Sequence, residues 1–222
     1  MTIANAKRQV TRYFRARHAE LRLLGGARVR QDSDFLELYV LVRLTELAQG
    51  DVRQTFQRGG AKVFRVAGSP SPNWMDASYV QIGALAARTG LQVQCGAATA
   101  ELDVVVIDPA QVQAGGLVPA GAAVAAFECK AYGGRVQLPH ADQMIGKARR
   151  VWREMPLKAV TSPGGACQRF AGVALNGSAA SVRDVLAAEG IALADDVAQE
   201  LDALIFALIN VVTAAPLAFG TP

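Results

Sequence analysis

Two acidic segments with the pattern of β-strands constrain this chain more than any other feature. The first reads Glu-Leu-Asp-Val-Val-Val-Ile over residues 101–107, and the second reads Phe-Glu-Cys-Lys and ends at Lys130. Side chains alternate between the two faces of a strand, so Glu101 and Asp103 share one face, as do Glu128 and Lys130. The apolar neighbours predict a mostly buried sheet. Charges in such a sheet are costly unless they are paired or bind a metal, so the pattern predicts a cation site.

Length and composition indicate one substantial domain. The 222 residues are 51% hydrophobic, which is enough for a core without disulfides. The three cysteines form no Cys-x-x-Cys pair and there are only two histidines, which argues against structural zinc and for a reducing, cytoplasmic compartment. No secretory signal is expected. The apolar run at 203–219 is interrupted by polar residues and Pro216, and predicts a buried helix, not a membrane span.

The first 30 residues carry eight lysines and arginines against one glutamate. We expect residues 1–30 to form a basic helical extension and residues 31–222 to form a single domain. A positive field attracts phosphate backbones or an anionic surface. A solvated helix face is the alternative that the charge pattern leaves open.

Hydrophobic periodicity predicts helices first, then a cluster of short strands, then alternating helix and strand. Helices are expected at about residues 4–24, 33–49, 139–155, 180–189 and 197–213, and strands at about 63–66, 79–82, 91–94, 102–107, 124–130 and 169–175. This order is typical of an α/β or α+β fold with a mixed central sheet flanked by helices.

The acidic segments resemble the PD-(D/E)XK nuclease superfamily, which has the restriction-endonuclease-like fold. The resemblance rests on Asp103 and, 25 positions later, on the Glu-x-Lys element formed by Glu128, Cys129 and Lys130. It extends from about residue 37 to about residue 175. The proline that usually precedes the aspartate is missing here. Asp108, which lies before a proline in reversed order, falls on the opposite strand face, so Asp103 is the preferred acid.

The resemblance implies a metal-dependent DNA endonuclease of the bacterial restriction or defence type. Asp103, Glu128 and the backbone carbonyl of Cys129 would bind Mg²⁺ or Mn²⁺, because hard cations prefer oxygen ligands. Lys130 would orient the attacking water or stabilise the pentacovalent phosphate. The thiol of Cys129 would face the core.

Further site residues are expected on helices before and after the acidic strands. Glu37, on the second helix, is the expected additional carboxylate, and Glu101 competes with it. Gln143 resembles a glutamine that family members place near the scissile phosphate, whereas His140 is expected to be a polar residue at the helix start. The basic residues expected to bind nucleic acid are Lys147, Arg149, Arg150 and Arg153.

The expected partner is DNA, with no membrane. Cutting both strands usually needs two active sites, so a homodimer is expected, or else a subunit of a larger defence complex. Two other functions remain open from the sequence: a structure-selective repair or junction nuclease of the same superfamily, and a non-catalytic binding or regulatory module that keeps the fold. The target, and the choice between DNA and RNA, also remain open.

Overall fold

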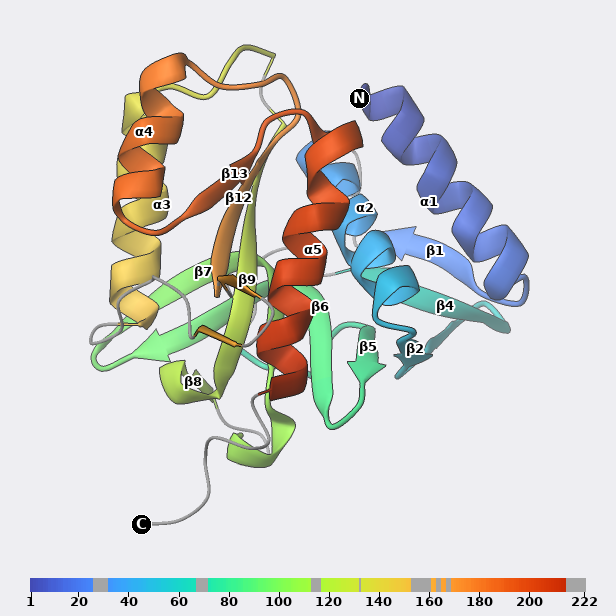
Figure 1. The fold of residues 1–222 in the computed structure, drawn as a ribbon. Coiled ribbons are helices and arrows are strands. Elements are labelled where there is room, and N and C mark those ends of the chain that lie inside the picture. The colour runs from blue at the N-terminus through green and yellow to red at the C-terminus, as the bar shows by residue number, and fades with distance from the viewer. Residues whose placement is uncertain are drawn as a thin grey trace.

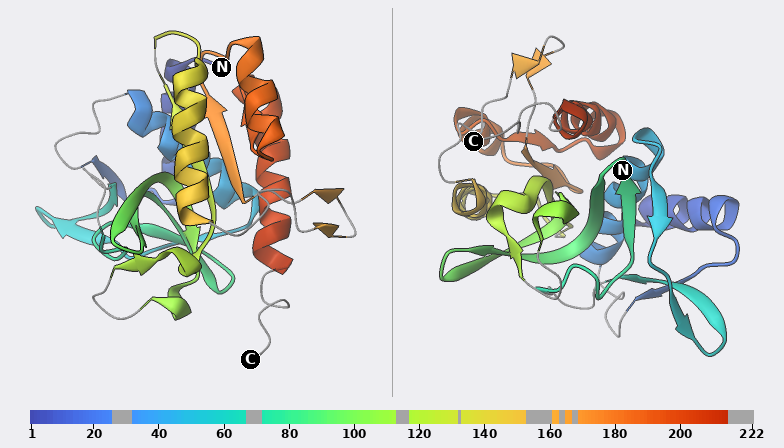
Figure 2. Two further views of the ribbon diagram at one scale, coloured as in Figure 1. Left: turned by 90° about the vertical axis from the view of Figure 1, so that its left-hand side faces the viewer. Right: turned by 90° about the horizontal axis from the view of Figure 1, so that it is seen from below.

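A computed structural model describes residues 1–25, 32–66, 72–112, 117–131, 133–152, 161–162, 165–166 and 169–214 (Figures 1 and 2). Its helices are α1 (Ile3–Arg17), α2 (Asp32–Leu47), α3 (Leu138–Val151), α4 (Ala180–Ala188) and α5 (Val197–Ala214), with short 3₁₀ turns at Pro109–Gln111 and Ala120–Ala122. In the described parts of the chain, no helix is both long and apolar enough to cross a membrane.

A central sheet of eight strands organises the fold. Its order is β13 (Ala192–Ala194), β12 (Phe170–Ala174), β9 (Ala123–Lys130), β7 (Ala98–Ile107), β6 (Leu85–Cys95), β5 (Tyr79–Ile82) and β2 (Asp51–Arg53), with β8 (Val118–Pro119) paired to β6. The strands β13, β12 and β9 are parallel, and the other pairs along this order are antiparallel. The predicted α+β class with a mixed central sheet is therefore confirmed.

Two smaller sheets complete the strands. One has the order β1 (Arg22–Gly25), β4 (Ala61–Val66) and β3 (Phe56–Arg58), and the other pairs β10 (Thr161–Ser162) with β11 (Gly165–Ala166). The helix predicted over about residues 4–24 was wrong in its last third, because α1 ends at Arg17 and residues 22–25 pair in parallel with β4. Pairing with a strand distant in sequence outweighed the local helical spacing.

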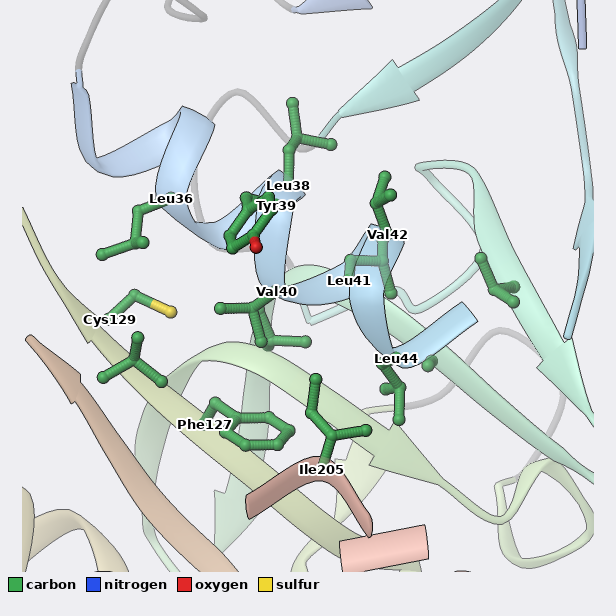
Figure 3. Packing of buried hydrophobic residues seen from close by; sticks show 14 of the residues in the cluster. Leu36, Leu38, Tyr39, Val40, Leu41, Val42, Leu44, Phe127, Cys129 and Ile205 are labelled. Atoms are coloured by element: carbon green, nitrogen blue, oxygen red, sulfur yellow. The ribbon is translucent and has the colours of Figure 1, made fainter. Parts of the chain in front are cut away.

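Helices cover both faces of the central sheet (Figures 1 and 2). On one face α2 and α5 bury apolar side chains against β7 and β9, with α1 packed outside α2. On the other face α3 and α4 form a second core with the opposite sides of the same strands. Figure 3 shows Leu36 and Val40 of α2 close to Cys129 and Phe127 of β9, with Ile205 of α5 beside them. These two layers hold the middle of β7 and the end of β9, where the predicted strand residues of the site lie.

Candidate active site

The hydrogen-bonded ladder between β7 and β9 does not extend to Asp103. Its last pair at this end is Val104 with Phe127, and the β6–β7 register likewise omits the pair of Gly90 and Asp103. Gly90 has a φ of 56°, a left-handed conformation that suits glycine. Oδ2 of Asp103 accepts a hydrogen bond of 2.7 Å from the backbone N–H of Cys129. The carboxylate thus replaces a backbone acceptor where the two strands cease to pair.

Glu128 is fully buried between two lysines. Its Oε1 accepts hydrogen bonds from Nζ of Lys130 at 2.5 Å and from Nζ of Lys147 at 2.6 Å, and its Oε2 accepts one from Lys147 at 2.8 Å. Lys130 lies two residues away on β9, and Lys147 reaches across from α3. A buried carboxylate is tolerated when it is paired and hydrogen-bonded in this way. Removal of either lysine would leave much of that charge without a partner.

A glycine on β12 allows α3 to approach Glu128. Gly172 is the register neighbour of Glu128, so the two positions share a sheet face. A Cβ atom on Gly172 would lie 2.7 Å from Cδ1 of Leu193 and 3.1 Å from Sδ of Met144. Met144 therefore packs directly on the strand backbone, and Lys147, three residues further along α3, comes within reach of Glu128.

An open cavity of about 430 Å³ lies where β7 and β9 stop pairing. Its lining residues are Asp32, Ser33, Glu37, Glu101, Asp103, Cys129, Lys130 and Ala131. The structure therefore places four of the predicted residues, Asp103, Lys130, Glu37 and Glu101, around one space together with Cys129. Glu128, which was predicted to be a metal ligand, is not among the lining residues: it is fully buried and pairs with Lys130 of the cavity wall.

Two carboxylates that line the cavity, those of Asp103 and Glu37, resist ionisation. Burial, and next the charge of Glu128, raise the pKa of Asp103 to about 7, although Lys147, Lys130 and the Cys129 N–H act in the opposite direction. Burial also raises the pKa of Glu37 well above its ordinary value, with Asp103 the next cause. A cation in the cavity would favour the charged forms of both acids.

The donor set fits a hard divalent cation held by few protein ligands. Within the described residues, no three His, Cys, Asp or Glu side chains are grouped closely enough to hold a metal by themselves. Mg²⁺ commonly takes one or two carboxylates and completes its shell with water and substrate phosphate. Asp103 and Glu37 supply such oxygens. The carbonyl of Cys129 lies on the same strand edge as its N–H, which points to Asp103.

No catalytic role was expected for the thiol of Cys129 or for Asp108, and both have structural roles. The thiol of Cys129 is buried against α2, as predicted, and burial raises the pKa of this thiol (Figure 3). Asp108 caps the 3₁₀ turn that follows β7: it accepts hydrogen bonds from the Ala110 N–H at 3.0 Å and from Nε2 of Gln111 at 2.8 Å. Asp103, and not Asp108, is therefore the acid that faces the cavity.

The side chains predicted on α3 have different surroundings. Gln143 is exposed, one turn before Lys147. His140 accepts a hydrogen bond of 3.0 Å from the Gln137 N–H and closes the helix start, as expected of a polar residue there. Arg149 forms an ion pair of 2.6 Å with Glu189 on the surface, and Arg150 is exposed. Arg153 lies outside the described residues.

The contact between Lys147 and Glu128 was not anticipated from the sequence. Lys147 was expected to bind nucleic acid because it is one of several basic residues on a helix after the site. One feature of the sequence could have indicated this contact. Lys147 lies four residues after Gln143, which was expected to face the site, so both side chains lie on the same side of the helix. Sequence reasoning also missed Asp32, which lines the cavity and pairs with Lys7 at 3.1 Å.

Comparison of the chain with models of known protein families, with curated proteins and with solved structures finds no match.

Proposed function

We propose that this protein is a metal-dependent endonuclease of the PD-(D/E)XK type that hydrolyses phosphodiester bonds in DNA. One arrangement carries the proposal. Asp103 leaves the ladder at the cavity, and the Glu128–Lys130 pair lies on the adjacent strand with Lys130 in the cavity wall. A structural ion pair alone would not require Asp103 to lie beside it with a pKa raised to about 7. Acids with such shifts, next to a lysine in an open cavity, are typical of functional sites.

Each residue has a separate role in this proposal. Asp103 and Glu37, with the Cys129 carbonyl, would hold Mg²⁺ or Mn²⁺, which when bound neutralises phosphate charge and activates water. Lys130 places a fixed ammonium in the cavity wall, where charge develops on the phosphoryl oxygens. Glu128 orients Lys130 through the bond of 2.5 Å, and Lys147 holds both oxygens of Glu128 in place.

The assignment of Lys130 can be tested by substitution with methionine, which keeps the length and removes the charge. We expect the Lys130→Met variant to cut DNA about 10²- to 10³-fold more slowly than the wild type in Mg²⁺, because one preorganised charge is lost. Cleavage of plasmid and linear duplex DNA is measured under single-turnover conditions, with circular dichroism to verify folding.

Lys62→Met is the matched control, since Lys62 is an exposed lysine of β4 outside the cavity. It should cut at the wild-type rate. Equal rates for Lys130→Met and the wild type would remove Lys130 from the proposed mechanism. Single-stranded, branched and RNA substrates in the same assay distinguish a restriction-type nuclease from a structure-selective one.

The proposal also includes a paired assembly. The cavity lined by Asp103 and Lys130 supplies one proposed site per chain, and cutting both strands of a duplex in one encounter needs two. We therefore expect a homodimer on DNA, or a larger complex that contains two copies.

A further inference from the structure

Helix α1 carries five basic residues and no acidic one. Arg8, Arg12 and Arg15 are spaced by four and three positions, so they lie along one side of the helix, and all three are exposed. Within the described parts of the chain, none of these three arginines forms an ion pair with a carboxylate. Their guanidinium groups therefore present an uncompensated positive stripe.

The opposite side of α1 is already occupied by protein. Ala6, Val10, Tyr13 and Phe14 are buried in the core shared with α2, and Phe14 packs against Phe64 with ring centroids 5.1 Å apart. A basic helix binds a bilayer surface by inserting its apolar side. That side is not available here, so the stripe is suited to a ligand recognised by charge alone.

The helix begins beside the cavity. Nζ of Lys7 lies 3.1 Å from Oδ1 of Asp32, a cavity-lining residue, and 4.7 Å from the ring centroid of Phe35 on α2. From Lys7, α1 runs along the outside of α2 (Figure 1). At 1.5 Å per residue, Lys7 and Arg15 are about 12 Å apart along the helix axis. The arginine stripe therefore starts one residue after a lysine that pairs with the cavity lining.

We propose that the Arg8–Arg12–Arg15 stripe binds the phosphate backbone of the substrate DNA beyond the scissile position. The inference rests on the proposed function, since it identifies a DNA contact outside the same site. Each arginine would pair with one phosphate and displace one condensed counterion. The contacts would add affinity without sequence preference, because phosphates are the same at every step.

The test measures salt-dependent binding of a fluorescein-labelled DNA duplex in EDTA, where no cleavage occurs. We compare the wild type with the triple variant Arg8→Gln, Arg12→Gln, Arg15→Gln, whose exposed positions and helix-forming glutamines preserve α1. The slope of log affinity against log salt should become shallower by about 2 to 3. Between about 50 and 200 mM salt, the wild type should therefore lose about 40-fold more affinity than the variant.

A triple variant of Arg53, Arg58 and Lys62 to glutamine makes the same charge change on exposed strand residues and should keep the wild-type slope. An unchanged slope in the α1 variant, or an equal change in the control, would overturn the inference. Binding of the wild type to anionic vesicles in preference to DNA would also overturn it. Failure of the wild type to cut DNA would contradict the proposed function, whereas the slopes report on the stripe independently.

Discussion

Asp103 combines a structural disadvantage with the chemical role proposed for it. Its carboxyl group is buried next to Glu128, and its pKa is raised to about 7. A buried group that opposes its own ionisation weakens the fold at neutral pH. Such a group is expected where binding of a cation restores the charged form.

The Asp103→Asn variant should be more stable than the wild type in metal-free buffer at pH 8. An ordinary aspartate ionises near pH 4, so between about pH 4 and pH 7 the unfolded chain loses this proton while the folded chain retains it. Wild-type stability from this group is therefore lost as pH rises through that window. Asparagine does not titrate and can still accept the bond from the Cys129 N–H.

Thermal melts from pH 4 to pH 8 test this. The excess Tm of Asp103→Asn over the wild type should be small at pH 4 and largest above pH 7. A constant difference between Asp103→Asn and the wild type across the range would mean that Asp103 titrates as an exposed acid.

At the level of elements, the site depends on how closely α3 approaches the sheet. Gly172 has no side chain, so Met144 contacts β12 directly and Lys147 reaches Glu128. Much of the element pattern followed from the sequence: α2, β5, β9 and α4 lie within two residues of their predicted bounds. The close approach of α3 to the sheet could not be predicted from the sequence, because a glycine in a strand does not indicate which helix will lie over it.

Gly172→Ala should lower the free energy of unfolding by about 1 to 3 kcal/mol, because the new methyl group overpacks a filled core. Gly146→Ala on α3 is the matched control. Its Cβ would contact nothing within 4 Å, and alanine favours helix over glycine, so this variant should be stabilised by up to about 1 kcal/mol. Denaturant unfolding measures both variants. Changes of the same sign would contradict the packing described for α3.

Across the whole molecule, the predicted fold class is confirmed. Asp103, Lys130 and both alternative carboxylates, Glu37 and Glu101, line one cavity, whereas Glu128 does not. The fold class could be predicted because hydrophobic periodicity is a local property of each segment. The pairing of β1 with β4 and the contact of Lys147 with Glu128 depend on segments far apart in the chain. Contacts of this kind cannot be predicted from the spacing of residues within one segment.

The central claim is that the cavity cuts phosphodiester bonds with a divalent cation held by Asp103. The most direct test is the single-turnover rate of DNA cleavage at pH 8 as Mg²⁺ is titrated, for the wild type, Asp103→Asn and the control Asp108→Asn. We predict Mg²⁺-dependent cleavage by the wild type and the control, and a rate lower by at least about 100-fold in a folded Asp103→Asn. Equal rates for the wild type and Asp103→Asn, or no cleavage by the wild type on any nucleic acid, would contradict the account.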